Sequence, residues 1–370
     1  MKVQEKSDEI QQNDTICDAL HCSVDALHYN ALMKRHSSKS SIRFYFSFCL
    51  LAVLLVSGCQ RNDIPLAQSR HTAVATYSAD ISDSGKYSLV ASINHDAGLW
   101  DLEQDSLLYT WTHGDTEDDI IAVDIASGDR FAITATSKTM AIWSLENGSN
   151  IGFYELHESD LRDIKLSSNG RNLIMALGDG RVIHLNIKTG RRLEFVAHTE
   201  AINRIDISPN GRYVISAGND YKAIFWDAQT GQPLKTWDHQ SRVILTALSR
   251  DGKYAFTSGT KADAFIWDLV SGEQVSQLNL EKRQYVLSAA RFSDDNQYLL
   301  TGAPSRQLTL WQKDTGKVLQ TLNVSTRTTN KPSGAIIYAV GFNAAGDLLT
   351  ESSAGWGERW ALTPEAQTKN

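Results

Sequence analysis

The sequence has no run of about 20 consecutive apolar residues, the length that an α-helix needs to cross a bilayer. Its longest mostly apolar segment, residues 44–56, has thirteen residues. It also has no excess of basic residues, because 36 Lys and Arg stand against 43 Asp and Glu, a formal net charge of -7. Nucleic-acid binding draws on clustered Lys and Arg, so this balance argues against a nucleic-acid partner.

The local motifs of common catalytic and cofactor-binding sites are missing as well. The chain contains no G-x-x-x-x-G-K-[ST], no strand-to-helix G-x-G-x-x-G, no H-E-x-x-H and no G-x-S-x-G. We therefore predict that the protein is not an enzyme and that it holds neither a cofactor nor a metal. A nucleophile and a base brought together by the fold stay open as an alternative, because sequence separation does not limit such a pair.

Cysteine is scarce and confined to one end of the chain. Cys17, Cys22, Cys49 and Cys59 are the only four, and none follows residue 59. A metal or redox role for Cys17 and Cys22 is disfavoured, because four residues separate them and no second pair lies nearby. The remainder of the chain needs no disulfide.

The apolar segment has the surroundings of a secretory signal. A basic stretch, residues 33–43, precedes it, and Ser57-Gly58-Cys59 follows it. A buried core helix is the alternative, but the basic and polar flanks disfavour it. The ending Val56 to Cys59 resembles the bacterial lipobox. That resemblance implies cleavage before Cys59, lipid attachment to Cys59 and a lipid-anchored protein; each buried CH₂ of the lipid contributes about 0.8 kcal/mol.

The predicted signal and lipobox-like ending divide the chain into five parts. Residues 1–32 are predicted to be a disordered upstream extension or a mis-assigned start, with translation beginning at Met33. Residues 33–58 are the signal, 59–63 the lipidated cysteine and a short tether, 64–362 the folded domain and 363–370 a tail. By resemblance to the lipoprotein sorting rule, Gln60 in place of Asp implies the outer membrane of a Gram-negative cell, with the protein facing the periplasm.

The folded domain is built from a repeat. Seven turn sequences follow one another, and each turns on a residue that tolerates a positive φ. These pivots are Gly85, Gly128, Gly170, Gly211, Gly252, Asn296 and Gly346. The residues that lie 14 or 15 positions after them are Trp100, Trp143, His184, Trp226, Trp267, Trp311 and Trp360.

Successive positions in the second set are 43, 41, 42, 41, 44 and 49 residues apart. A period of about 40–45 residues with short strands is typical of propeller blades. The units resemble the WD-repeat family, on GLWD (98–101), IFWD (224–227) and FIWD (265–268). The resemblance implies an all-β fold, a seven-bladed β-propeller of four-stranded antiparallel blades. Residues 226–237 also resemble pyrroloquinoline-quinone propellers, but only Trp111 and Trp237 follow that pattern.

The last unit has too few residues for its fourth strand. Ten residues follow Trp360, and Pro364 among them would break a strand ladder. Residues 64–69 precede the first unit and have no other use. We expect them to complete the seventh blade and thereby to close the ring.

The family often links a His, a Ser or Thr, an Asp and the Trp by hydrogen bonds. The fourth unit fits this structural tetrad with His198, Ser216, Asp220 and Trp226. His113, His157 and His239 stand in the His position of other units. The Asp position there holds Ser137, Lys261, Ser305 and Ala354. We therefore expect the network in the fourth unit only, and we expect His184 to fill the Trp packing slot of the third.

By the same resemblance, such propellers bind protein segments on the face made by the turns between second and third strands and by the connections between units. Aromatic and Arg residues dominate interface energetics. The candidate partner-binding residues are His95, Lys138, Tyr221, Lys261, Arg283, Tyr285, Arg306, Arg327 and Trp356. We predict a monomeric protein-binding scaffold in the bacterial envelope. An assembly factor for outer-membrane proteins and a propeller enzyme or cofactor protein are the alternatives.

Overall fold

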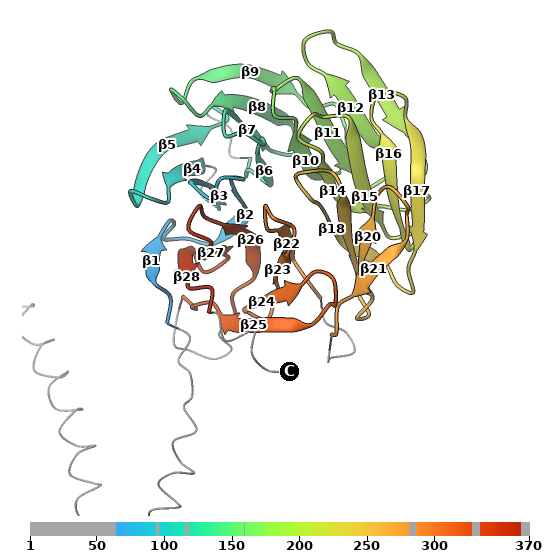
Figure 1. Cartoon of the computed structure of the whole chain (residues 1–370). Helices are drawn as coiled ribbons and strands as arrows, with labels where there is room; N and C mark the ends of the chain where they lie inside the picture. The colour runs from blue at the N-terminus through green and yellow to red at the C-terminus, as the bar shows by residue number, and fades with distance from the viewer. Residues whose placement is uncertain are drawn as a thin grey trace, which may run out of the picture. The chain divides into compact units, whose positions relative to one another are not determined.

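The computed structural model describes residues 64–93, 96–114, 118–158, 160–280, 286–327 and 334–363. These residues form 28 strands in seven four-stranded antiparallel sheets that stand around a central axis (Figure 1). The predicted all-β, seven-bladed propeller is thus confirmed. The predicted upstream extension, the signal and Cys59 lie outside the described residues.

Each blade runs outward from the axis through four strands, here called a, b, c and d, which are consecutive in the chain except in blade 7. Blades 1 to 4 comprise β2 (Thr76–Ile81), β3 (Tyr87–Ser92), β4 (Asp96–Asp101) and β5 (Ser106–Thr112); β6 (Ala122–Ile125), β7 (Phe131–Ala135), β8 (Thr139–Ser144) and β9 (Asn150–Glu155); β10 (Leu161–Leu166), β11 (Asn172–Leu177), β12 (Val182–Asn186) and β13 (Arg192–Phe195); and β14 (Ile202–Ile207), β15 (Tyr213–Gly218), β16 (Lys222–Asp227) and β17 (Gln232–Asp238). Blades 5 to 7 comprise β18 (Val243–Leu248), β19 (Tyr254–Gly259), β20 (Ala264–Asp268) and β21 (Gln274–Gln277); β22 (Ala289–Phe292), β23 (Tyr298–Gly302), β24 (Gln307–Gln312) and β25 (Val318–Asn323); and β26 (Ile337–Phe342), β27 (Leu348–Ser352), β28 (Trp356–Trp360) and β1 (Ala67–Arg70).

The seven pivots lie in the a–b turns, and all of them have a positive φ, between 55° and 89°. A serine stands three residues before the pivot in five of the blades and closes the turn. Ser208 is an example, since its Oγ accepts a hydrogen bond from the backbone N of Tyr213 at 2.9 Å. A short polar side chain and a residue that tolerates the left-handed region together make this tight turn.

The N-terminal strand of the propeller closes the ring, as predicted. β1 pairs antiparallel with β28, with Ala67 opposite Arg359 and Arg70 opposite Trp356. The predicted segment, residues 64–69, differs slightly from the observed strand. Of its first three residues, Leu66 contributes a hydrogen bond, from its backbone N to the O of Arg359 at 2.7 Å.

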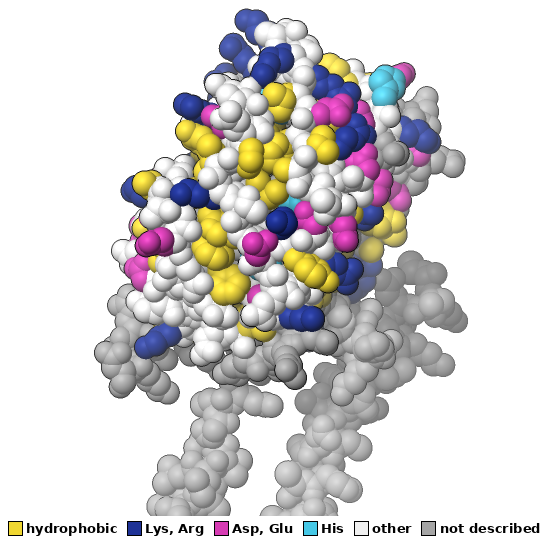
Figure 2. All heavy atoms as spheres, turned by 90° about the vertical axis from the view of Figure 1, so that its right-hand side faces the viewer, with side chains coloured by type: hydrophobic (Ala, Val, Ile, Leu, Met, Phe, Trp, Pro, Cys, Tyr) yellow, Lys and Arg dark blue, Asp and Glu magenta, His cyan; other side chains and the backbone are white. Residues whose placement is uncertain are grey.

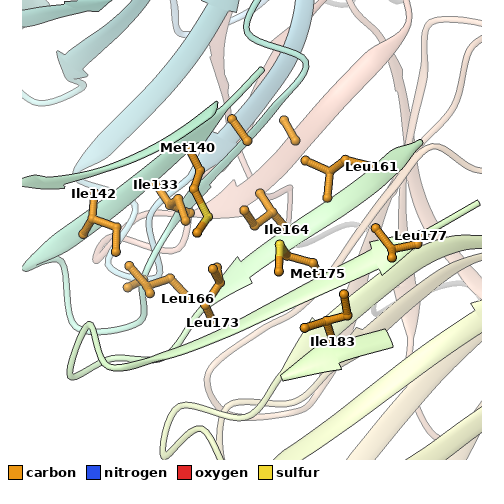
Figure 3. Close-up of a cluster of buried hydrophobic side chains, with 13 residues drawn as sticks. Ile133, Met140, Ile142, Leu161, Ile164, Leu166, Leu173, Met175, Leu177 and Ile183 are labelled. Atoms are coloured by element: carbon orange, nitrogen blue, oxygen red, sulfur yellow. The ribbon is translucent and has the colours of Figure 1, made fainter. Parts of the chain in front are cut away.

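Hydrophobic side chains fill the spaces between neighbouring blades. Figure 3 shows the cluster between blades 2 and 3, where Ile133 and Met140 of one blade meet Ile164 and Met175 of the next. Ring stacking adds a second contact between blades: an aromatic residue at the end of strand d lies on the strand-c Trp of the following blade. These pairs are Trp111 on Trp143, Phe195 on Trp226, Trp237 on Trp267 and, from blade 7 to blade 1, His71 on Trp100, with ring centroids 4.3–5.1 Å apart.

Candidate binding face

The order of the strands gives the propeller two different faces. The b–c turns and the d–a connections lie on one face, which we call the b–c face, because strands alternate in direction within each blade. The a–b and c–d turns lie on the opposite face, here called the a–b face. Loops held by a rigid frame are where binding residues usually stand.

The described candidate residues all belong to the b–c face. Lys138, Tyr221 and Lys261 are exposed in the b–c turns of blades 2, 4 and 5. Arg306 of blade 6 and Trp356 of blade 7 are half-buried, and Arg327 is exposed in the connection between these two blades. His95, Arg283 and Tyr285 lie outside the described residues.

Two of these residues have a backbone conformation that suits glycine. Tyr221 and Arg306 have φ values of 67° and 73°, and each stands five residues before the Trp of its blade. Gly355 occupies the same place in blade 7, with a φ of 79°. A bulky residue in this region is strained, and strained residues gather at functional sites. Ala262 stands at the same place in blade 5 with a φ of 50°, so the conformation recurs in this turn. Tyr221 and Arg306 are the strongest candidates because they place an aromatic ring and a guanidinium there.

The structure brings together three members of the tetrad in blade 4. His198 Nδ1 lies 2.9 Å from Asp220 Oδ1, and His198 Nε2 lies 2.8 Å from Ser216 Oγ. The indole N–H of Trp226 is buried without a hydrogen-bond partner among the described residues. Trp226 packs instead against the ring of Phe195, at a centroid distance of 4.3 Å. His184 of blade 3 is buried and lies 3.2 Å from Asn172 Oδ1.

The expectation that the network is confined to blade 4 was wrong. In blade 5, His239 Nε2 lies 2.9 Å from Thr257 Oγ1, which also accepts a hydrogen bond from Trp267 Nε1 at 2.7 Å. Its carboxylate belongs to Asp263, 3.4 Å from His239 Nδ1, and not to the Lys261 position. Counting back a fixed number of residues from the Trp missed it, because Asp263 stands on the other side of the turn.

Blade 2 has a network of the same kind without a carboxylate. His113 lies 2.8 Å from Thr134 Oγ1, which accepts a hydrogen bond from Trp143 Nε1 at 2.8 Å, and Thr139 Oγ1 takes the place of the acid. Burial lowers the pKa of His113 to about 4, so its ring is neutral at pH 7. Burial also lowers the pKa of His198, although Asp220 opposes this shift. These histidines are suited to support the blades, not to exchange protons with a ligand.

We expect Asp263→Ala to destabilise the protein by about 2 kcal/mol, because the substitution leaves the buried Ser241 hydroxyl without its acceptor and removes the carboxylate beside His239. Lys261→Ala is the matched control and should change the free energy of unfolding by less than about 0.5 kcal/mol, as an exposed side chain usually does. Chemical denaturation of both variants measures the difference. Equal effects of the two substitutions would contradict the assignment of Asp263.

The axis of the propeller is lined by charged side chains of the innermost strands. Asp80, Asp124 and Asp206 each accept a hydrogen bond from a backbone N–H of the next blade, at 2.7–2.8 Å. Lys165 Nζ lies 2.7 Å from Asp124 Oδ1. Burial raises the pKa of Asp124 to about 7 and that of Asp206 to about 6. Each carboxylate thus ties one blade to its neighbour.

Ion pairs also bridge the axis at the a–b face. Arg250 of blade 5 and Arg291 of blade 6 both pair with Asp83 of blade 1, and the Arg250 Nε to Asp83 Oδ2 distance is 3.0 Å. Within the described ranges, no group of three or more His, Cys, Asp or Glu side chains could hold a metal ion. The axial charges therefore join blades that lie apart in the sequence.

The WD40 family profile, described as "WD domain, G-beta repeat", matches residues 190–227 of the chain. This segment contains His198, Ser216, Asp220 and Trp226 of blade 4, where the tetrad pattern is most complete. No curated protein matches the chain. In the part of the chain that the structure describes, no helix is long and apolar enough to span a membrane.

Proposed function

Since the chain is a seven-bladed β-propeller that carries a WD40 repeat, we propose that it is a lipid-anchored scaffold of the bacterial cell envelope that binds a partner protein on its b–c face. The fold is consistent with a protein-interaction scaffold. Tyr221 and Arg306 support the choice of face, because side chains of the types that dominate interfaces are held there on strained turns.

The direction of β1 is the observation that carries this proposal. Ala67 lies opposite Arg359 near the c–d end of blade 7, and Arg70 lies opposite Trp356 at its b–c end. The chain therefore enters the propeller at the a–b face. Four residues separate Cys59 from Ile64, and they reach roughly 15 Å when extended. A lipid on Cys59 would hold the a–b face near the membrane and leave the b–c face free for a partner.

Lipid attachment is tested by labelling cells with radioactive palmitate. We expect the wild-type protein to incorporate label and to fractionate with the outer membrane, because Cys59 follows a lipobox-like ending. Cys59→Ser should abolish both. Cys49→Ser is the matched control, since this cysteine lies within the cleaved segment, and it should leave the mature protein labelled. Loss of label in both variants, or in neither, would contradict lipid attachment at Cys59.

Partner binding is tested by chemical crosslinking in intact cells, followed by pull-down of the protein. We expect a defined partner protein that is lost from a Tyr221→Gly variant, in which the backbone strain is also removed. Altered outer-membrane protein content after gene deletion would assign the scaffold to the assembly of those proteins. Purification with a tight small-molecule or metal complex, and without a protein, would overturn the proposal in favour of a cofactor protein.

A further inference from the structure

The charges on the b–c face are divided between two regions. On blades 2 and 3 the cations are paired with carboxylates: Lys138 lies 3.0 Å from Asp118, and Arg181 lies 2.9 Å from Glu158. The side view in Figure 2, taken from where β13 and β17 lie, shows basic and acidic side chains next to one another. Around the junction of blades 6, 7 and 1, exposed arginines are not paired with carboxylates in this way.

Three arginines at that junction have no carboxylate in an ion pair with them among the described residues: Arg70, Arg306 and Arg327. The nearby acids are Glu351 and Glu358, and only 1% and 4% of their surfaces are exposed. Glu351 lies 2.7 Å from His71 Nδ1, while Glu358 accepts a hydrogen bond from Gln68 at 3.1 Å. Both acidic side chains are thus inside the blade. Half-buried Arg306 interacts electrostatically with Glu358, which opposes the rise of the Glu358 pKa that burial causes, whereas Arg70 and Arg327 are exposed.

The three arginines are held in place by backbone carbonyls. Arg306 Nε donates to the O of Val324 at 2.9 Å, and Arg70 Nη2 donates to the O of Ala73 at 3.2 Å. Arg327 donates to the O of Ala354 at 3.4 Å and also to the O of Val74. The guanidinium of Arg70 lies 5.8 Å from the centre of the Trp356 ring. We call these four residues, Arg70, Arg306, Arg327 and Trp356, the Arg–Trp cluster.

We propose that the Arg–Trp cluster binds an acidic segment of the partner protein, with side-chain carboxylates on the arginines and an apolar or aromatic side chain against Trp356. The inference rests on the proposed function and names the chemistry of its partner. A guanidinium carries five N–H donors in a fork that matches a carboxylate. The hydrogen bonds above occupy one donor each in Arg70 and Arg306 and two in Arg327, so donors remain for a ligand.

The way in which the arginines are held favours binding over a purely structural role. Side chains that are already fixed lose little rotamer freedom when a ligand arrives, which raises affinity. Arg306 has a backbone φ of 73°, at the position that Gly355 occupies in blade 7. Glycine would suit the turn better, so the benefit of Arg306 lies in its side chain.

The cluster also faces away from the end of the propeller to which the lipid tether is joined. Arg70 is the last residue of β1, whereas Ile64, where the described chain begins, is on the side of the a–b face. An acidic protein segment therefore fits the cluster better than an anionic lipid headgroup does.

The test uses the full-length lipoprotein in detergent and two fluorescent 12-residue peptides. One contains alternating Glu residues and a central Trp, and the other has Gln in place of each Glu. Fluorescence anisotropy gives the dissociation constants. We expect the acidic peptide to bind at least tenfold more tightly than its Gln counterpart, and the difference to shrink as salt is raised because the contacts are exposed charges.

Two substitutions and a control locate the site. Arg327→Ala and Arg306→Gly should each weaken binding of the acidic peptide about tenfold, which corresponds to about 1.4 kcal/mol. Arg306→Gly relieves the left-handed backbone but also removes the hydrogen bond to Val324 O, so the free energy of unfolding of each variant is measured beside its affinity, and a loss of binding by a folded variant locates the site. Arg191→Ala is the matched control, because Arg191 is also exposed and also donates to a backbone carbonyl, that of Gln229 at 2.7 Å, but on the a–b face. It should not change the affinity.

Equal affinities for the two peptides, or full binding by Arg327→Ala and Arg306→Gly, would overturn the inference. Binding to phosphatidylglycerol vesicles that is lost in Arg327→Ala, without binding of the acidic peptide, would overturn it in favour of a lipid headgroup. If the peptides fail while a partner is still crosslinked in cells through Tyr221, only the partner chemistry is wrong. If no protein is captured on the b–c face, the proposed function fails as well.

Discussion

Deletion of residues 64–70 is expected to lower the melting temperature of the protein by about 10 °C. The deletion removes β1, the fourth strand of blade 7, and exposes the edge of β28. It also takes away the hydrogen bond from Leu66 N to Arg359 O and that from Gln68 to the buried Glu358. At about 1 kcal/mol for each hydrogen bond, the loss amounts to roughly 4–5 kcal/mol.

The control is a deletion of residues 60–63, which removes part of the tether and leaves β1 in place. It should not change the melting temperature, because the first backbone hydrogen bond to β28 is made by Leu66, which this deletion keeps. Calorimetry of the two purified variants beside the wild type makes the comparison. An unchanged melting temperature after deletion of residues 64–70 would remove the inference that this strand closes the ring.

The second large effect is expected for Lys165→Met, which should cost about 3 kcal/mol at pH 8 because it leaves Asp124 as an unpaired charge near the axis. The side chains of Lys165 and Asp124 are only 19% and 6% exposed. Burial raises the pKa of Asp124 to about 7, and Lys165 opposes this rise. Without Lys165 the pKa of Asp124 should therefore rise further.

The sign of the pH dependence follows from this shift. The folded-state pKa of Asp124 lies above the 3.8 of an unperturbed Asp, so the protonated form is favoured in the fold. The stabilisation that comes from protonating Asp124 in the folded state is fully present below about pH 4 and is lost as the pH rises through 7. The cost of Lys165→Met should accordingly shrink from pH 8 to pH 5. Asp124→Asn is the companion variant, and adding Lys165→Met to it should cost much less. A cost that is independent of pH would contradict the buried ion pair.

The periodic features of the fold could be predicted from the sequence because they repeat in every blade. A pivot in the a–b turn recurs in all seven blades and an indole 14 or 15 residues later in six of them, with His184 in the third, and the seven turns and seven blades agree with the structure. Ring closure followed from the missing fourth strand after Trp360. The bounds of β1 were three residues off at its start and one at its end, because its residues, Ala67 to Arg70, lack the alternation of apolar and polar side chains that marks a half-buried strand.

Features that depend on contacts between blades were beyond the sequence. His71 stacks on Trp100 where other blades use Trp or Phe, and these two rings belong to the last and first blades, which become neighbours only when the ring closes. In blade 4, Asp220 precedes the residue of positive φ, whereas Asp263 in blade 5 follows it. The acid reaches its histidine from either side of the turn, so a fixed spacing identifies only one of the two. The positive φ of Tyr221 and Arg306 has no sequence signal at all.

The central claim is that the partner occupies the b–c face, and site-specific photo-crosslinking in intact cells tests it most directly. A photoreactive amino acid would replace Tyr221 or Arg306 on the b–c face, and Arg191 or Lys253, which are exposed residues on the a–b face. We expect one protein adduct of the same size from the first two positions and none from the other two. Adducts from Arg191 and Lys253 alone would contradict this claim.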